Sequence, residues 1–131
     1  MSKLKVDRIS GYTNKQVDSF IALKLKEDDR WAVQACKVLN EQQTAAERHA
    51  HLSIAGHNGM GFNRHDAPLL THIAGRINQN RTSDADVQSL HYKLPKYARQ
   101  IWRITEMRGG INKLRECLDR YYAGNQLPFQ Y

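Results

Sequence analysis

A basic segment between Asp86 and Glu106 holds the residues best suited to bind a polyanion. No acidic residue lies between these two positions. Three of its basic residues are spaced to share one helix face, and aromatic residues lie between them. Cations on one face can contact successive phosphates, and a neighbouring aromatic ring can stack on an unpaired base. We therefore predict a nucleic-acid contact surface made of Lys93, Lys96, Arg99, Trp102 and Arg103.

The aromatic residues of this segment are expected to have different roles. Tyr97 and Ile101 are four residues apart and are expected in the core. Trp102 lies off that stripe, next to Arg103, and is the better candidate for stacking on a base. The alternative interpretation is a solvated helix face whose aromatic residues all belong to the core.

A glycine-rich loop covers residues 56–63 and leads into a helix N-terminus, an arrangement that can hold phosphates. It has neither the Gly-Lys-Ser/Thr of a Walker loop nor the preceding strand of a dinucleotide-binding loop. We favour a tight interhelical turn in which Phe62 packs into the core and Asn58 and Asn63 hydrogen-bond the backbone. The residues given this structural role are Asn58, Gly59, Gly61, Phe62, Asn63 and Asp66, with Asp66 as the N-cap of the next helix.

The histidines and cysteines of the sequence are the candidate metal ligands and nucleophiles. All six histidines lie between residues 49 and 91, namely His49, His51, His57, His65, His72 and His91. His49 and His51 are two residues apart and point to different helix faces, whereas a helical metal pair is spaced by four. Cys36 and Cys117 fall at apolar positions, where a small buried thiol is the expected role. The sequence therefore predicts no catalytic residue, no metal site and no cofactor.

Helices must position all of these residues, because no segment alternates strictly between apolar and polar as a strand would. The strongest helical pattern covers Asp29–Leu52, which has no Gly or Pro and repeats apolar residues at steps of three and four. The acidic pair Asp28-Asp29 is expected to separate this helix from the one before it. Other helices are predicted over residues 14–27, 66–77, 83–94, 96–107 and 111–123.

Short local signals mark the ends of these helices. Residues 13–16 have the form of a capping box, in which the first and fourth residues bond each other's backbone N–H groups, and residues 83–86 form another cap-like pattern. Pro95 is expected to end or kink a helix, and Gly124 is placed to close the last one. We predict an all-α fold of five or six helices in one domain over residues 1–131, with residues 1–11 a flexible basic arm and 125–131 a short C-terminal tail.

Composition agrees with a globular chain and favours anionic partners. The 131 residues are 40% hydrophobic and 25% charged, and the formal net charge is +7. No apolar run approaches the ~20 residues of a membrane span, and the first residues lack the apolar core of a signal peptide. We therefore expect a cytoplasmic protein without a membrane partner.

Two stretches resemble a small helical domain of proteins from phages, plasmids and related bacterial mobile elements. Its members pair an Asn-Gly-x-Gly-Phe-Asn loop with a later Leu-Pro-Lys-Tyr-x-Arg-Gln helix. The first stretch here comprises Gln43-Thr44, Glu47, Asn58-Gly59-Met60-Gly61-Phe62-Asn63 and Asp66-Ala67, and the second is Leu94-Pro95-Lys96-Tyr97-Ala98-Arg99-Gln100-Ile101. One departure is that the segment before the basic motif, typically Leu-Ser-x-x-Gln, is Ser83-Asp84-Ala85-Asp86 followed by Gln88.

The resemblance covers about half of the chain, from Gln42 to Ile104. Similar domains occur alone or attached to helicase-like proteins, which implies work near nucleic acid. The leading hypothesis is a non-catalytic nucleic-acid-binding accessory protein of a phage or mobile element. One alternative is a small protein that binds and modulates or inhibits a host or phage enzyme, with its basic face against an acidic partner. A metal-dependent nuclease using the histidine-rich middle is the third.

Overall fold

The computed structural model describes residue 9, residues 11–52 and residues 61–126, except for the side chains of residues 43–52 and 124–126. Within this part the chain forms six α-helices and one 3-10 turn, and no strand. The elements are α1 (Asn14–Glu27), α2 (Asp29–Leu52), α3 (Ala67–Asn78), α4 (Asp84–Lys93), η1 (Leu94–Tyr97), α5 (Ala98–Met107) and α6 (Ile111–Gln126). The predicted all-α class is confirmed.

The predicted helix starts form by the expected local bonds. The Thr13 hydroxyl accepts the backbone N–H of Gln16, and the Gln16 side chain accepts the backbone N–H of Thr13. Ser83 and Asp86 form the same reciprocal pair at the start of α4. Asp28 separates α1 from α2, since its carboxylate accepts backbone N–H groups from the first turn of α2. Each bond satisfies a donor that a helix N-terminus leaves open.

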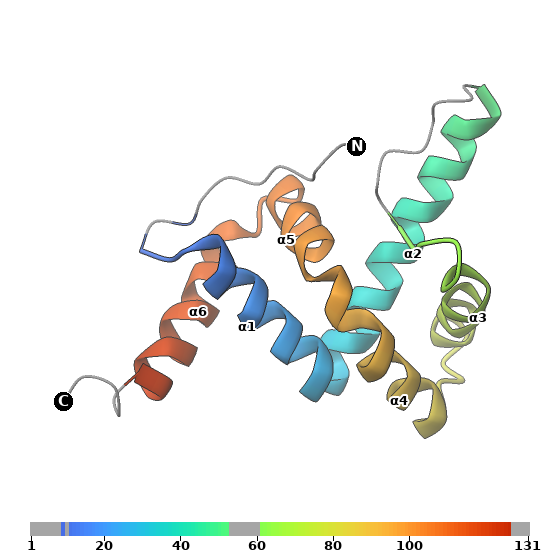
Figure 1. Ribbon diagram of the computed structural model, residues 1–131. Coiled ribbons are helices and arrows are strands. Elements are labelled where there is room, and N and C mark those ends of the chain that lie inside the picture. The colour runs from blue at the N-terminus through green and yellow to red at the C-terminus, as the bar shows by residue number, and fades with distance from the viewer. Residues whose placement is uncertain (1–8, 10, 53–60, 127–131) are drawn as a thin grey trace.

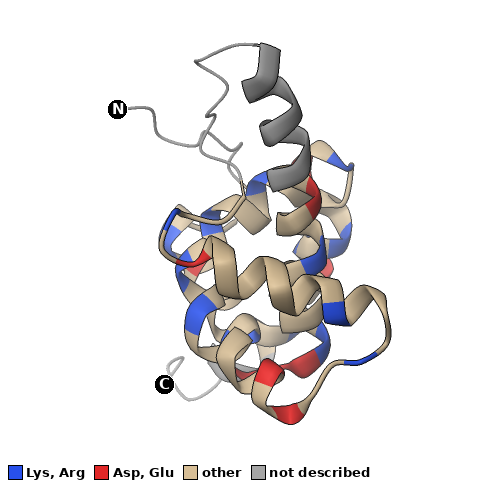
Figure 2. Ribbon diagram, turned by 90° about the vertical axis from the view of Figure 1, so that its right-hand side faces the viewer, with Lys and Arg blue, Asp and Glu red and all other residues tan. Residues whose placement is uncertain are grey.

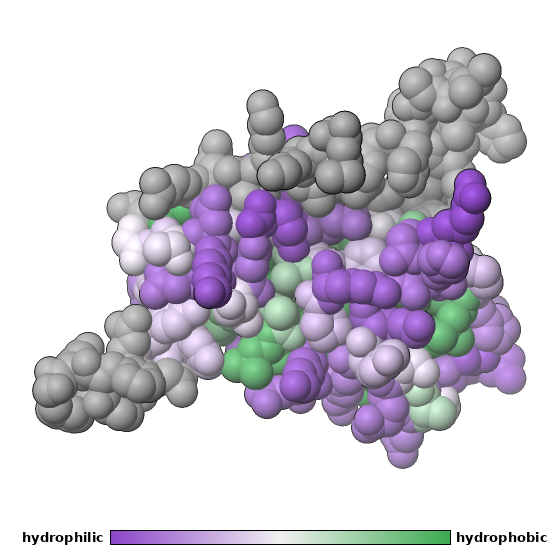
Figure 3. Space-filling model, viewed as in Figure 1, coloured by the Kyte–Doolittle hydropathy of each residue, from purple (hydrophilic) through white to green (hydrophobic). Residues whose placement is uncertain are grey.

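The path α4–η1–α5 runs through the middle of the molecule (Figure 1). α1 and α6 lie on one side of it, and α2 and α3 on the other. The core lies between these layers, and its largest fully buried side chains include Trp102, Phe20, Leu39 and Leu90. Hydrophilic side chains cover most of the described surface in the view of Figure 3. No helix in the described part of the chain is both long and apolar enough to cross a membrane.

Both predicted termini differ in part from expectation. Ile9, within the expected flexible arm, is buried among core residues, and residues 1–8 and 10 lie outside the described residues. The prediction that Gly124 closes the last helix is wrong, because α6 continues through it to Gln126. Residues 127–131 of the predicted tail lie outside the described part.

Candidate functional site

The glycine-rich loop and the Leu94–Gln100 segment, far apart in sequence, are joined by direct hydrogen bonds. The Gly61 backbone N–H donates to the Gln100 side-chain oxygen at 2.8 Å. The Asn63 backbone N–H donates to the Tyr97 hydroxyl at 2.9 Å. The Phe62 and Tyr97 rings meet edge to face, with centroids 6.3 Å apart. The described end of the glycine-rich loop, residues 61–63, and the Leu94–Gln100 segment therefore form one site.

The described end of the loop, residues 61–63, agrees with the predicted structural role. Gly61 has φ +90, a backbone conformation that favours glycine. Phe62 is buried in the core, as expected. The Asn63 side-chain oxygen accepts the Asp66 backbone N–H at 2.8 Å, so Asn63 bonds the backbone as predicted. Asn58 and Gly59 lie outside the described residues.

Asp66 is the N-cap residue of α3, as predicted, but its side chain makes no capping hydrogen bond. Its carboxylate accepts no backbone N–H of α3. The side chain is turned to the basic segment instead, where it accepts the Tyr97 hydroxyl at 2.8 Å. It also lies 2.7 Å from Lys96 Nζ and 3.5 Å from Lys93 Nζ. The cost of burying a carboxylate that is 2% exposed explains this preference, because two ammonium groups compensate its charge better than one amide.

The electrostatics of this site follow from that arrangement. Burial alone would raise the pKa of Asp66, but hydrogen bonds from Lys96 and Tyr97 and the nearby lysine charges outweigh it and lower this pKa. Burial and the Asp66 carboxylate raise the pKa of Tyr97, so its hydroxyl stays a donor. Asp66 is thus ionised, and its single negative charge faces two positive ones. Lys93 and Lys96 remain 33% and 51% exposed, which leaves positive charge at the surface.

The other two predicted cations are each matched by a carboxylate. Arg99 Nε donates to both oxygens of Asp18 on α1, at 2.9 and 3.1 Å. Arg103 Nη1 lies 3.1 Å from Glu106 Oε1, three residues further along the chain. The segment between Asp86 and Glu106 has no acidic residue, but its cations still pair with carboxylates. These carboxylates come from α1, from residue 66 and from the end of α5. The structure therefore brings Lys93 and Lys96 together around Asp66. Arg99 and Arg103 instead each form an ion pair with a different carboxylate.

The predicted stacking role of Trp102 is wrong. Its side chain is fully buried, and its outer neighbour is the Arg99 guanidinium, 5.4 Å from the ring centroid. The buried face of α5 is wider than the stripe through Tyr97 and Ile101, because Ala98, Trp102 and Ile104 also belong to it. A residue one step off a helical stripe is still within its apolar arc.

Sequence reasoning missed the aromatic residue that is exposed. Tyr92 is 82% exposed at the end of α4, and Lys93 Nζ lies 5.7 Å from its ring centroid. Its position two residues after the buried Leu90 places it on the far side of α4, which is the signal that could have found it. Arg64 and His65 are also exposed, in the loop just before Asp66.

The described histidines do not form a cluster. His65 and His72 are exposed, whereas His91 contacts the Leu25 carbonyl oxygen at 2.8 Å and Asp29 Oδ1 at 2.6 Å. Among the residues that the structure describes, no group of three or more His, Cys, Asp or Glu side chains could hold a metal. His57 and the side chains of His49 and His51 lie outside this description.

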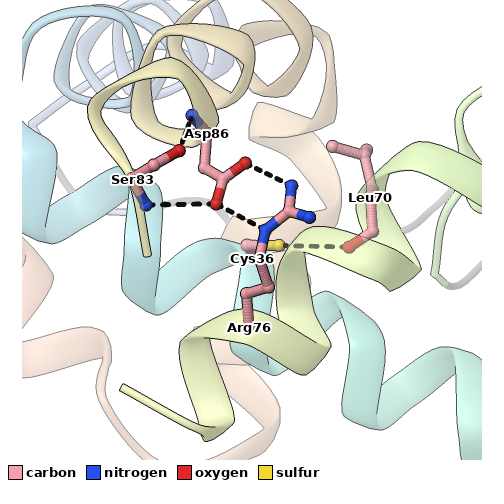
Figure 4. Close-up of polar contacts among 5 residues, drawn as sticks. All are labelled: Cys36, Leu70, Arg76, Ser83 and Asp86. Atoms are coloured by element: carbon pink, nitrogen blue, oxygen red, sulfur yellow. Dashed lines mark hydrogen bonds and ion pairs between the residues drawn. The ribbon is translucent and has the colours of Figure 1, made fainter. Parts of the chain in front are cut away.

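A second buried carboxylate lies between α3 and α4 (Figure 4). Asp86 is 4% exposed, and both its oxygens accept from the Arg76 guanidinium. The hydrogen bond from Arg76 lowers the pKa of Asp86 to about 2, with the Ser83 backbone adding to it against the opposing effect of burial. Nearby, the Cys36 thiol faces the Leu70 carbonyl oxygen at 3.7 Å, and burial raises its pKa to about 12. This thiol is therefore protonated and structural.

The basic residues do not form one continuous band on the face that carries α3. Lys and Arg are scattered over it and are interrupted by Asp and Glu (Figure 2). A binding surface on this fold thus depends on local excess of positive charge, as at Lys93 and Lys96.

No family model matches the chain, and comparisons with curated proteins and with solved structures find no match. A function is therefore inferred from the residues of the site and their geometry.

Proposed function

We propose that this protein binds nucleic acid without catalysing a reaction on it, through a surface made of Lys93, Lys96 and Tyr92. The observation that carries the proposal is the buried Asp66 carboxylate with two partly exposed ammonium groups beside it. One carboxylate cannot neutralise both, so a phosphate oxygen approaching from solvent meets net positive charge.

An aromatic ring stands next to these charges. Tyr92 is largely exposed and within cation–π distance of Lys93, so its ring offers a platform for an unpaired base. The exposed Arg64 follows Asn63, whose backbone is bonded to Tyr97. It adds a cation of the loop to the same region. We expect single strands to be preferred, because a base paired in a duplex exposes no face to stack on.

The wider setting comes from the resemblance described above. A net charge of +7 and a loop end that bonds the Leu94–Gln100 segment suit an accessory protein of a phage or mobile element. In this proposal the protein positions or protects a nucleic-acid strand for other proteins.

The experiment is an electrophoretic shift panel with single- and double-stranded DNA and RNA, each at two salt concentrations. The test variant is Lys93→Gln/Lys96→Gln, and the matched control Lys15→Gln/Lys26→Gln removes the same charge from exposed positions of α1. We expect the test variant to lower the slope of log affinity against log salt by about two, roughly one per lost contact. The control should leave most of the slope in place.

Tyr92→Ala separates stacking from charge. It should weaken single-strand binding by about 1–3 kcal/mol and change duplex binding little. Failure of the parent to bind any of the four nucleic acids, or equal losses in test and control variants, would contradict the proposal.

A further inference from the structure

An apolar groove of about 300 Å³ runs between α2 and α5, away from the lysine site. Its floor is formed by Ala35 and Val38 of α2 and by Ile101 and Ile104 of α5, each at most 8% exposed. The half-buried Trp31 also lines it. Apolar side chains therefore form the floor of the groove at the junction of the two helices.

Cations stand at both ends of this groove. Arg30 lines it at the start of α2, and Arg108 lines it just after the end of α5. Arg108 Nη2 lies 2.8 Å from Glu41 Oε1, and Glu41 follows Arg30 by eleven residues, or ~16 Å along a helix. The backbone positions of Arg30 and of Glu41, the partner of Arg108, are thus about three helical turns apart along α2.

The lining of the groove, whose residues are all described, contains no carboxylate, and the carboxylate paired with Arg108 stands outside it. The Arg108–Glu41 pair is about half exposed on both sides, so an incoming carboxylate can replace Glu41 at little cost. Arg30 also lines a second pocket together with Glu27, Asp28 and Asp29, and Asp28 already accepts the backbone N–H groups of Arg30 and Trp31. An occupant with acidic groups would complement the two arginines that line the groove itself.

The shape favours a helix as the occupant. Arg108, just after α5, pairs with Glu41 of α2, and Arg30 lies at the start of α2. The groove therefore follows both helices from their starts, although the two ribbons diverge upward in Figure 1. A third helix can lie in the groove between two neighbouring helices, with apolar side chains at steps of three and four facing the floor. A helix three turns long matches the separation along α2 of Arg30 and Glu41, the partner of Arg108.

We propose that this groove binds an amphipathic helix of a partner protein, with apolar residues on one face and a carboxylate near each end. This is a protein-binding activity separate from nucleic-acid binding. It uses Arg30 and Arg108 and leaves Lys93, Lys96 and Tyr92 free for the other surface.

The test is a selection from a displayed library of peptides of about 12 residues, made against the full chain. Synthetic copies of the enriched peptides are then titrated against the parent and against Arg30→Glu/Arg108→Glu by fluorescence anisotropy. The matched control is Arg81→Glu/Arg120→Glu, which reverses two exposed arginines outside the groove. Circular dichroism and thermal melting verify that each variant folds.

We expect enriched peptides with apolar residues at helical spacing and acidic residues towards both ends. The groove variant should bind them about tenfold more weakly, and the control should stay within about twofold of the parent. Copies with their acidic residues replaced by lysine should bind the groove variant better than the parent.

Three results would overturn the proposal: no enrichment, enriched peptides without acidic residues, or equal weakening in both variants. Loss of a parent dimer in the groove variant, seen by sedimentation, would make a second copy of this chain the occupant and also overturn it. The Lys93→Gln/Lys96→Gln variant should bind the peptides as the parent does, so this proposal and the proposed function can fail separately.

Discussion

Two buried carboxylates solve the same physical problem in different ways, and the difference separates a structural contact from a candidate binding site. Asp86 is 4% exposed and Asp66 is 2% exposed. Asp86 is matched by one arginine, whose planar guanidinium bonds both of its oxygens. Asp66 is held by a tyrosine hydroxyl and two lysines.

The consequence lies in the charge that remains. The Asp86–Arg76 pair is neutral and complete, and it fixes α3 against α4. The Asp66 site keeps one positive charge in excess on flexible side chains that reach solvent. A buried acid with one arginine therefore indicates structure, whereas a buried acid with two lysines leaves a cation available for a ligand.

The largest effect is expected from Asp86→Ala. It leaves the Arg76 guanidinium unpaired and removes half of the capping box with Ser83, so the free energy of unfolding should fall by about 2–3 kcal/mol. Urea unfolding followed by circular dichroism measures this. Asp84→Ala, at an exposed position of the same helix turn, is the control and should change stability by less than about 0.5 kcal/mol. Similar losses in the two variants would remove the structural role given to Asp86.

Tyr97→Phe should have the next largest effect. It deletes the hydroxyl that accepts the Asn63 N–H and donates to Asp66, which leaves the Asn63 N–H without this acceptor and Asp66 with its lysines alone, at a cost of about 1–2 kcal/mol. The control is Tyr92→Phe, whose ring is 82% exposed and should lose almost nothing. Thermal unfolding of both proteins provides the comparison, and equal melting temperatures would mean that this hydroxyl does not hold the loop.

Asp66→Asn tests the charge imbalance directly. The amide oxygen can still accept the Tyr97 hydroxyl, but both lysines lose their counter-charge. We expect nucleic-acid affinity to rise by about threefold at low salt, since a nearby negative charge is removed, while stability falls by about 1 kcal/mol. Asp86→Asn should not raise affinity. Fluorescence anisotropy with a labelled single strand measures both, and a fall in affinity for Asp66→Asn would be the contrary result.

The smallest effect is expected at a third carboxylate, Asp29, which is 73% exposed and pairs with His91. Burial opposes protonation of His91, but Asp29 and the Leu25 carbonyl oxygen outweigh it and raise its pKa. Because the folded pKa lies above the unfolded value of about 6.5, the pair stabilises the fold below that pH. The stabilisation is lost as pH rises through the folded pKa, by less than about 1 kcal/mol.

His91→Gln should remove this pH dependence. Unfolding free energies of parent and variant, measured between pH 5 and 8 (about the range of histidine titration), should differ more at the acidic end than at the basic end. A constant difference across this range would contradict the assigned contact.

The local structure was predictable because its causes are local. The Thr13 and Ser83 capping boxes and the positive φ of Gly61 each depend on residues a few positions apart. The contacts of the site could not be predicted in this way, because they join segments that are far apart in the sequence. Asp18 and Arg99 are 81 positions apart, and so are invisible to helical periodicity.

The side chains of Asp66 and Trp102 differ from expectation for specific physical reasons. Asp66 is the N-cap residue of α3, but its buried carboxylate bonds the lysines and Tyr97 and not the N–H groups of the helix, because its charge must be compensated. Trp102 is expected at the surface because it lies off the apolar stripe through Tyr97 and Ile101. In the structure, helices pack on both sides of α5, so a wider arc of this helix is buried and includes Trp102. In both, tertiary burial overrides a preference that nearby residues suggest.

The short 3-10 turn η1 sets the rotational phase between the two helices that it joins. Each of its four residues turns the chain by about 120°, against about 100° in an α-helix, so α5 starts roughly 80° ahead of a continued α4. Residues three apart also eclipse in this geometry, which aligns Lys93 and Lys96 over one carboxylate. Insertion of one residue would rotate α5 by about 100°, turning Trp102 outward and parting the lysines. In any chain that keeps this site, the length of the segment between Lys93 and Ala98 should therefore be fixed even where its residues change.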